Sequence, residues 1–135
     1  MAVHNRTYDE ALKVALATGA QLETMLVEPI PPGWRADSVS AGRDTWIAKV
    51  LTAYGDATPS MLQDIRRGRR TEIEFINGYV VNMARQFGLE APINAAIVDT
   101  VHAITSSRLA PNPGLLAQVL QARNCRASSC AAPEI

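Results

Sequence analysis

The sequence predicts an all-α protein that folds as a bundle of helices. Apolar residues recur at helical spacing along most of the chain, and no alternating strand pattern of useful length is present. Glycine, proline and helix-capping residues divide these stretches into separate helices. The chain has 135 residues, of which 47% are hydrophobic. This is the size and composition of one globular domain with a buried core.

The first helix is predicted from the capping box Thr7-Tyr8-Asp9-Glu10, in which Thr7 and Glu10 satisfy each other's backbone amides. Leucine and alanine residues follow at helical spacing, and Gly19 is a suitable stop. Residues 28–42 are rich in Pro, Gly and Ser and are predicted to form a loop. Helical spacing resumes near Asp44 and continues through the apolar residues Trp46, Ile47, Val50, Leu51 and Tyr54.

Two further helix starts lie close together. Thr58 before Pro59 predicts a short helix with Thr58 as its cap, ending near Gly68. The sequence Thr71-Glu72-Ile73-Glu74 is a second capping box, and it opens a longer helix that ends near Gly88. The buried stripe predicted for this longer helix consists of Ile73, Ile76, Val80, Val81, Ala84 and Phe87.

The last two helices are predicted on either side of a Pro- and Gly-containing break at 111–114. Pro92 begins the first of them, with an inner face formed by Ile93, Ile97, Val101 and Ile104. The second is short and amphipathic, with the apolar residues Leu115, Leu116, Val119 and Leu120. We therefore expect one domain over residues 1–108, followed over 109–135 by a short helix and a flexible tail.

Charge and hydropathy exclude several classes of protein. The chain carries 13 basic and 13 acidic residues, and this balance argues against a general nucleic-acid binder. No apolar run approaches the roughly 20 residues needed to cross a bilayer. Asp9, Glu10 and Lys13 also interrupt any signal-peptide-like region. We expect a cytoplasmic protein that binds neither nucleic acid nor membrane.

Metal and nucleotide sites are not predicted either. A zinc site needs about four ligands, whereas His4 and His102 lie far in sequence from the two cysteines, Cys125 and Cys130. Two ordinary thiols are favoured over a disulfide, which would close only a small loop. The chain has no G-x-G-x-x-G after a strand and no P-loop sequence, so it carries no nucleotide-binding domain of its own.

Ser60 and Glu72 are the strongest candidates for a binding site. Each lies at a predicted helix start, where free amides and the helix dipole favour an anion such as a carboxylate. A hydroxyl and a carboxylate at neighbouring helix starts could line one small-molecule pocket. Spacing alone favours the alternative that both are ordinary first-turn residues, because such positions attract these residue types.

Four arginines, Arg66, Arg67, Arg69 and Arg70, surround Gly68. Their guanidinium groups could bind phosphate or nucleic acid. However, no aromatic residues are interleaved with them, and they follow a predicted helix end, where cations are favourable to the dipole. A solvated, structural role is therefore the favoured interpretation.

Other polar residues carry weaker signals. Gly78 is interpreted as a close-packing position inside a helix, and Asn77 as polar lining or surface. His102 has no evident triad partner and is predicted to be a surface or hydrogen-bonded imidazole. Asp64, Asn82 and Asn94 are ambiguous, while Lys13 and Lys49 are predicted to be surface charges.

One ordered pattern covers the middle of the chain, namely Ser60-Met61-x-Gln63-Asp64, Gly68-Arg69-x-Thr71-Glu72-Ile73, Ile76-Asn77-Gly78 and Gly88-x-x-x-Pro92-x-Asn94. It resembles the C-terminal domain of ketopantoate reductases, also called 2-dehydropantoate 2-reductases. The resemblance covers about residues 7–105 and excludes the tail after Thr105. It implies that residues 1–108 form an all-helical domain, truncated at its start, of the type shared with 6-phosphogluconate dehydrogenases.

The resemblance also implies a function. In the family this domain follows a Rossmann domain that binds NADPH, and a lysine acts as general acid in the reduction of ketopantoate to pantoate, on the route to pantothenate and coenzyme A. A glutamate matching Glu72 positions substrate and lysine, and a serine matching Ser60 binds the substrate carboxylate. We therefore expect Glu72 as a catalytic residue, Ser60 as a substrate-binding residue, a ketopantoate-like 2-keto acid as substrate and no metal.

The pattern departs from the family in one respect. The family's lysine, its neighbouring asparagines and the NADPH domain would all lie before Met1, and Lys13 falls on a later helix than that lysine. We therefore expect no reduction of ketopantoate by this chain without a Rossmann domain or chain as partner. The alternative is a non-enzymatic helical module derived from the family, which associates with itself or with another protein through an exposed apolar face.

Overall fold

Helices make up the regular structure in the part of the protein that the computed structural model describes, residues 2–23, 48–55 and 57–127. In chain order they are α1 (Ala2–Ala17), a helical stretch at 48–54, α3 (Ser60–Arg66), the π-helical turn η2 (Glu74–Gly78), α4 (Tyr79–Gln86), α5 (Pro92–Thr105) and α6 (Leu115–Ala127). These described residues contain no strand, so the predicted all-α class is confirmed.

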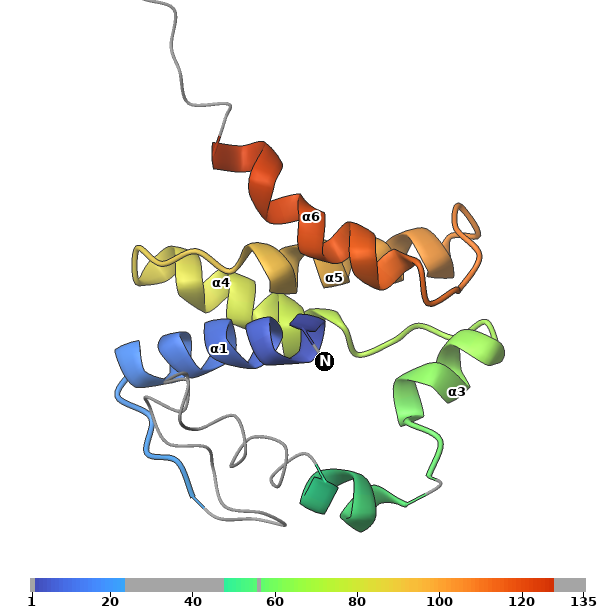
Figure 1. The fold of residues 1–135 in the computed structure, drawn as a ribbon, viewed down its shortest axis with the longest axis horizontal. Helices are drawn as coiled ribbons and strands as arrows, with labels where there is room; N and C mark the ends of the chain where they lie inside the picture. The colour runs from blue at the N-terminus through green and yellow to red at the C-terminus, as the bar shows by residue number, and fades with distance from the viewer. Residues whose placement is uncertain (1, 24–47, 56, 128–135) are drawn as a thin grey trace, which may run out of the picture.

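Four helices pack as a bundle. α1, α4 and α5 lie against one another, and α6 packs on α5 and α1 (Figure 1). The core between them contains the buried Val14, Ala84 and Ala91, and it is completed by the partly buried Val80, Val81, Met83 and Leu89. By contrast, α3 and the helical residues 48–54 lie to one side of the bundle (Figure 1), and no residue of α3 is fully buried.

The predicted helix ends agree well with the structure. α1 ends just before Gly19, α3 just before Gly68, and α4 just before Gly88. Each of these glycines has a positive φ of 65–75°, a backbone conformation that favours glycine because it lacks a Cβ. Pro92 is the first residue of α5, as predicted.

The predicted capping box at the first helix is wrong. α1 begins at Ala2, and Thr7 lies inside it, where its hydroxyl donates to the carbonyl of Val3 at 2.8 Å. Glu10 does not cap its own helix but accepts hydrogen bonds from the backbone amides of Ile93 and Asn94, at 2.9 Å each. Its carboxylate therefore caps the N-terminus of α5.

The two later helix starts also differ from prediction. Pro59 is the residue before α3, so the helix begins one residue later than expected, and no side chain caps it. Thr71 and Glu74 form no capping box, because the helix after them opens with η2 and has no side-chain cap. In η2 the amide of Gly78 donates to the carbonyl of Ile73 at 3.0 Å, five residues back.

The buried stripe predicted for this helix is therefore only partly correct. Ile73 and Ala84 are buried, and Val80 and Val81 pack against the core. Ile76 is 50% exposed because it lies in η2, where the wider turn breaks the α-helical spacing on which the prediction depended. Phe87 is 46% exposed because it lies beyond the end of α4.

The last two helices confirm the predicted pattern. Ile93 is buried on α5, and the other three residues of the predicted inner face, Ile97, Val101 and Ile104, are partly buried. On α6, Leu115 and Val119 are buried while Leu116 is 56% exposed. The predicted loop at 28–42, the residues Trp46 and Ile47, and the end of the tail at 128–135 lie outside the described residues.

Candidate functional site

The two residues singled out from the sequence, Ser60 and Glu72, are in direct contact. The Ser60 hydroxyl donates a hydrogen bond to Glu72 Oε1 at 2.9 Å. Ser60 is the first residue of α3 and is exposed, whereas Glu72 is half-buried just before η2. A hydroxyl and a carboxylate from two segments thus lie side by side at the surface, although 12 residues separate them in sequence.

The chain between them explains this contact. α3 ends at Arg66, and the amide of Arg69 donates to the carbonyl of Asp64 at 2.9 Å, which reverses the chain direction around Gly68. The chain then returns to the bundle, where the side chain of Ile73 is 2% exposed. This buried anchor follows Glu72 directly, in the segment that brings the Glu72 carboxylate within 2.9 Å of the Ser60 hydroxyl on α3.

Such a pair can bind two kinds of chemical group. The serine hydroxyl can donate to a carboxylate oxygen of a ligand, and the glutamate carboxylate can accept from a ligand hydroxyl or an ammonium group. Among the described residues, no cluster of three or more His, Cys, Asp or Glu could hold a metal ion.

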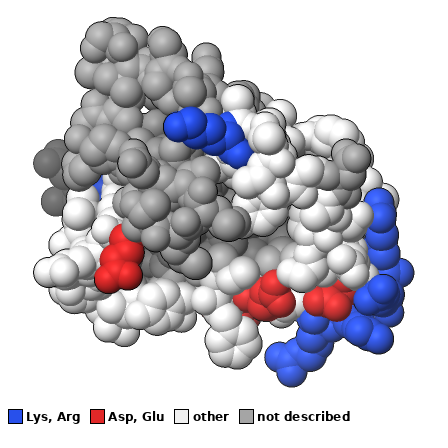
Figure 2. Space-filling model, turned by 90° about the horizontal axis from the view of Figure 1, so that it is seen from below, with Lys and Arg blue, Asp and Glu red and all other residues white. Residues whose placement is uncertain are grey.

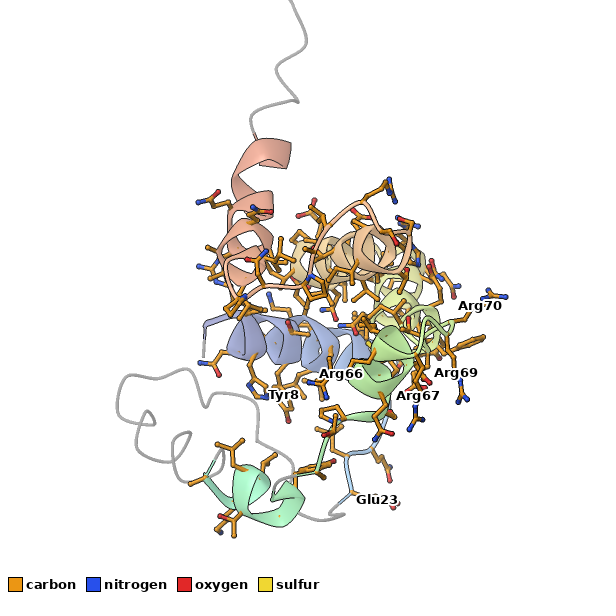
Figure 3. All side chains as sticks on the ribbon, turned by 90° about the vertical axis from the view of Figure 1, so that its right-hand side faces the viewer. Tyr8, Glu23, Arg66, Arg67, Arg69 and Arg70 are labelled. Carbon is orange, nitrogen blue, oxygen red and sulfur yellow. The ribbon has the colours of Figure 1, made fainter. Side chains whose placement is uncertain are left out.

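The arginine cluster lies next to this pair in sequence, and all four of its arginines are exposed, as predicted. Figure 3 shows Arg67, Arg69 and Arg70 projecting outward from one side of the molecule. Figure 2 shows basic side chains gathered at one edge of the face seen there, with acidic side chains beside them. A hydrated environment of this kind gives each guanidinium group little stabilising interaction with the fold.

A second polar cluster, more deeply buried, joins α1, η2 and α5. The side-chain amide of Asn94 is 1% exposed and donates to Glu10 Oε2 at 2.7 Å and to the carbonyl of Thr7 at 3.3 Å. Its oxygen accepts from Asn77 Nδ2 at 2.8 Å. Together with the two backbone amides bound by Glu10, these bonds satisfy the polar atoms of Asn94 in an otherwise apolar environment.

The sequence prediction left Asn94 ambiguous and missed the role of Glu10. One signal was present, because Ala91, the residue before α5, has no side-chain oxygen to cap the helix. The free amides at the start of α5 therefore required an acceptor from elsewhere. Asn77 was interpreted as polar lining or surface, and it is half-buried against Asn94.

An apolar groove of about 510 Å³ lies beside this buried cluster. Its walls come from α1, η2, α4, α5 and α6, and it is lined by Val3, His4, Thr7, Tyr8, Ala11, Ile76, Asn77, Val80, Asn94, Ile97 and Leu116. Neither Ser60 nor Glu72 contributes to this lining. The groove and the Ser60–Glu72 pair are therefore separate features of the surface.

The remaining candidates lie elsewhere. Lys13 is exposed on α1 and lines a different hollow of about 330 Å³, to which neither residue of the pair contributes. His102 Nε2 lies 2.9 Å from Glu74 Oε1, so it is a hydrogen-bonded surface imidazole, as predicted. Gly78 is buried, and a Cβ there would lie 2.6 Å from Glu74 Oε2, the end of a flexible side chain that can move away.

The ends of the chain add little to the candidate site. Cys125 falls near the end of α6, and Cys130 lies outside the described residues. Within the part of the chain that the structure describes, none of the helices has the length and apolar character required to span a bilayer.

Comparison with known proteins identifies the family. A family model described as "Ketopantoate reductase PanE/ApbA C terminal" matches residues 1–105, a range that contains Ser60, Glu72 and the buried polar cluster. The chain belongs to the ketopantoate reductase family. The resemblance inferred from the sequence pattern is thereby confirmed, and the matched region is the C-terminal domain of that family.

Individual relatives agree with this assignment. A 2-dehydropantoate 2-reductase of Archaeoglobus fulgidus is 36% identical over 74 residues, covering 55% of this chain and 24% of the relative. The enzyme of the same name from Pyrococcus horikoshii is 63% identical over 35 residues, covering 26% of this chain and 12% of the relative. The one from Vibrio cholerae is 29% identical over 87 residues, covering 62% and 29%.

The matches cover only part of the length of each relative. The chain spans less than a third of the length of each of these relatives. No solved structure matches the chain significantly. The comparisons and the helical structure therefore establish the family and the all-α class, while the more specific likeness to 6-phosphogluconate dehydrogenase domains stays a prediction.

Proposed function

We propose that this chain provides the substrate-binding part of an NADPH-dependent 2-dehydropantoate 2-reductase, which reduces ketopantoate to pantoate. The observation that carries the proposal is the 2.9 Å hydrogen bond between Ser60 and Glu72. The sequence pattern selected these two residues on independent grounds, and they lie within the segment that matches the family. Two side chains of the required chemistry, from separate segments, meet at an accessible position.

In this proposal Ser60 binds the carboxylate of the 2-keto acid. Its hydroxyl donates to Glu72, and it can turn to a substrate carboxylate by rotation about its side-chain bond. Because Ser60 is exposed at the start of α3, a small anion can reach it without displacing any buried group. Arg69 and Arg70 precede Glu72 closely in the sequence, and their positive charges would lessen the repulsion between Glu72 and an anionic substrate.

Once the Ser60 hydroxyl has turned to the substrate, the Glu72 carboxylate can accept a hydrogen bond from another donor. A carboxylate at this position can hold a substrate hydroxyl and orient the ammonium group of a general acid. Lys13 is not placed for that role, because it lines a hollow to which neither Ser60 nor Glu72 contributes. The general acid is assigned to the polypeptide that supplies the Rossmann domain.

NADPH is not assigned to the residues that the structure describes. They contain no strand, and therefore no strand-turn-helix cradle for the phosphates of a dinucleotide. A Rossmann domain, in whatever polypeptide it occurs, would hold the cofactor that supplies the hydride. This chain contributes the binding and orientation of the keto acid, and a cytoplasmic biosynthetic role accompanies that assignment.

Reconstitution with a partner tests the proposal. The chain is mixed with a fragment of the Archaeoglobus fulgidus relative that lacks the portion aligned here, and ketopantoate-dependent oxidation of NADPH is followed. We expect turnover only when both polypeptides are present, a raised KM after Ser60→Ala and a reduced kcat after Glu72→Ala. Asn82→Ala, an exposed substitution on α4, serves as control. Turnover that is unaffected by Glu72→Ala would refute the assignment.

A second function is favoured by the exposed apolar side chains next to the candidate site. Phe75 is 85% exposed, Tyr79 59% and Ile76 50%, all on η2 or the start of α4. Apolar surface of this kind favours association with itself or with a partner protein. Sedimentation velocity at several concentrations tests this alternative, which predicts an oligomer that Phe75→Ser converts to a monomer. A monomer at all concentrations, with no partner bound, would count against it.

A further inference from the structure

The orientation of Glu72 depends on a turn that is not α-helical. The carbonyl of Glu72 accepts hydrogen bonds from the amides of Phe75 and Ile76, at 2.9 and 3.2 Å, so the backbone of Glu72 is bonded to the first turn of η2. Replacing the π-helical turn by an α-helical one would rotate Glu72 relative to α4 by about 100°, the angle that one residue occupies in a helix. The reach of its carboxylate toward Ser60 therefore depends on η2.

Side-chain bonds from α5 hold this turn in place. Asn77, the fourth of the five residues of η2, donates to Asn94 at 2.8 Å, and Glu74, the first, pairs with His102 at 2.9 Å. The two contacts differ in strength. The Glu74–His102 pair has exposed fractions of 52% and 45%, whereas Asn94 is 1% exposed, so water competes for the first contact far more than for the second.

Asn94 cannot adjust to a loss of this contact. Its amide nitrogen is held by Glu10 and by the carbonyl of Thr7, so its oxygen is left pointing at Asn77. Glu10 in turn is fixed by two backbone amides at the start of α5. A chain of hydrogen bonds thus runs from α1 through α5 to η2, where Asn77 is its last member.

From these contacts we infer that Asn77 is a positioning residue, which holds η2 so that Glu72 stays within hydrogen-bonding distance of Ser60. Only the consequence of this positioning for catalysis rests on the proposed function. The positioning itself is a property of this chain alone. π-Helical turns occur frequently at functional sites, because they place a side chain where a regular helix would not.

The test measures whether Ser60 still senses Glu72 when Asn77 is removed. The carboxyl carbon of Glu72 is observed by NMR in the full chain at a fixed pH, with and without Ser60→Ala. The shift caused by Ser60→Ala reports the contact. We expect that shift to fall about fivefold in an Asn77→Ala background, because one net hydrogen bond changes the ratio of two populations by about this factor. In the control background Asn82→Ala it should be unchanged, because Asn82 is an exposed residue of α4.

A full-size Ser60→Ala shift in folded Asn77→Ala would overturn the inference, because the turn would then hold Glu72 without Asn77. If Asn77→Ala does not fold, Asn77→Ser takes its place, because serine is too short to reach Asn94. The two possible results then have the same meaning. This test needs neither cofactor nor partner. If reconstitution gives no reductase activity while the shift is lost as expected, the proposed function fails and the positioning role stands.

Discussion

Replacing Glu10 should destabilise the protein far more than replacing any other acidic residue of its neighbourhood. The carboxylate accepts three hydrogen bonds, from the backbone amides of Ile93 and Asn94 at 2.9 Å and from Asn94 Nδ2 at 2.7 Å. Two of these donors belong to the free N-terminal turn of α5. The third belongs to a side chain that is 1% exposed and has only a 3.3 Å contact to Thr7 as an alternative.

The expected cost follows from these contacts. Loss of a helix cap costs about 1 kcal/mol, and a buried donor left without an acceptor costs about 1–3 kcal/mol. Glu10→Ala should therefore lower the free energy of unfolding by about 3 kcal/mol, which corresponds to a decrease in Tm of about 10 °C for a domain of this size. Glu10→Gln keeps an oxygen acceptor but loses the charge, and it should cost about half as much.

Urea unfolding followed by circular dichroism at 222 nm measures the effect, provided that the transition is two-state. Glu90→Ala is the matched control, because Glu90 is exposed and lines the same hollow as Glu10. We expect the control to change stability by less than about 0.5 kcal/mol. If Glu10→Ala costs no more than Glu90→Ala, the carboxylate does not hold α5, and the reasoning about the buried cluster is wrong.

Three smaller effects are expected, all measurable as changes in the unfolding free energy. Gly88→Ala should destabilise by about 1 kcal/mol, because its φ of 65° is unfavourable for alanine although no atom lies within 4 Å of the new Cβ. Gly78→Ala should change stability by less than about 1 kcal/mol. Its Cβ displaces the flexible Glu74 side chain and weakens the exposed pair with His102, while alanine favours the helix. Ser60→Ala should also cost less than about 1 kcal/mol, since Ser60 is exposed, so a large loss of activity with a small loss of stability would separate function from folding.

Sequence alone predicted where three of the helices end and where α5 begins. Gly19, Gly68 and Gly88 follow helix ends, and Pro92 starts α5. These predictions succeeded because they depend on the backbone preferences of single residues, which neighbouring helices seldom overrule. The pattern around Ser60 and Glu72 also predicted the family. In the structure these two residues form a hydrogen bond with each other.

The predictions that failed concern the partner of a polar side chain. Thr7 and Glu10 fit a capping box, but Glu10 caps a helix that begins more than 80 residues later. A local pattern cannot reveal this, because a carboxylate binds whichever free amides the fold brings nearest. Likewise, Thr71 and Glu74 fit a second box, yet the carboxylate of Glu74 lies 2.9 Å from the imidazole of His102 on α5.

The same distinction applies to the helix that follows Glu72, which consists of η2 and α4. Its apolar spacing predicted Ile73 and Ala84 in the core, and both are buried. Its π-helical start, η2, was seen only in the tertiary structure. There, Asn77 and Glu74 of η2 contact residues of α5. The sequence by itself thus determined the helices, their ends and the family. Packing between helices decided which amides Glu10 satisfies and where Glu72 points, because both depend on atoms that meet only after folding.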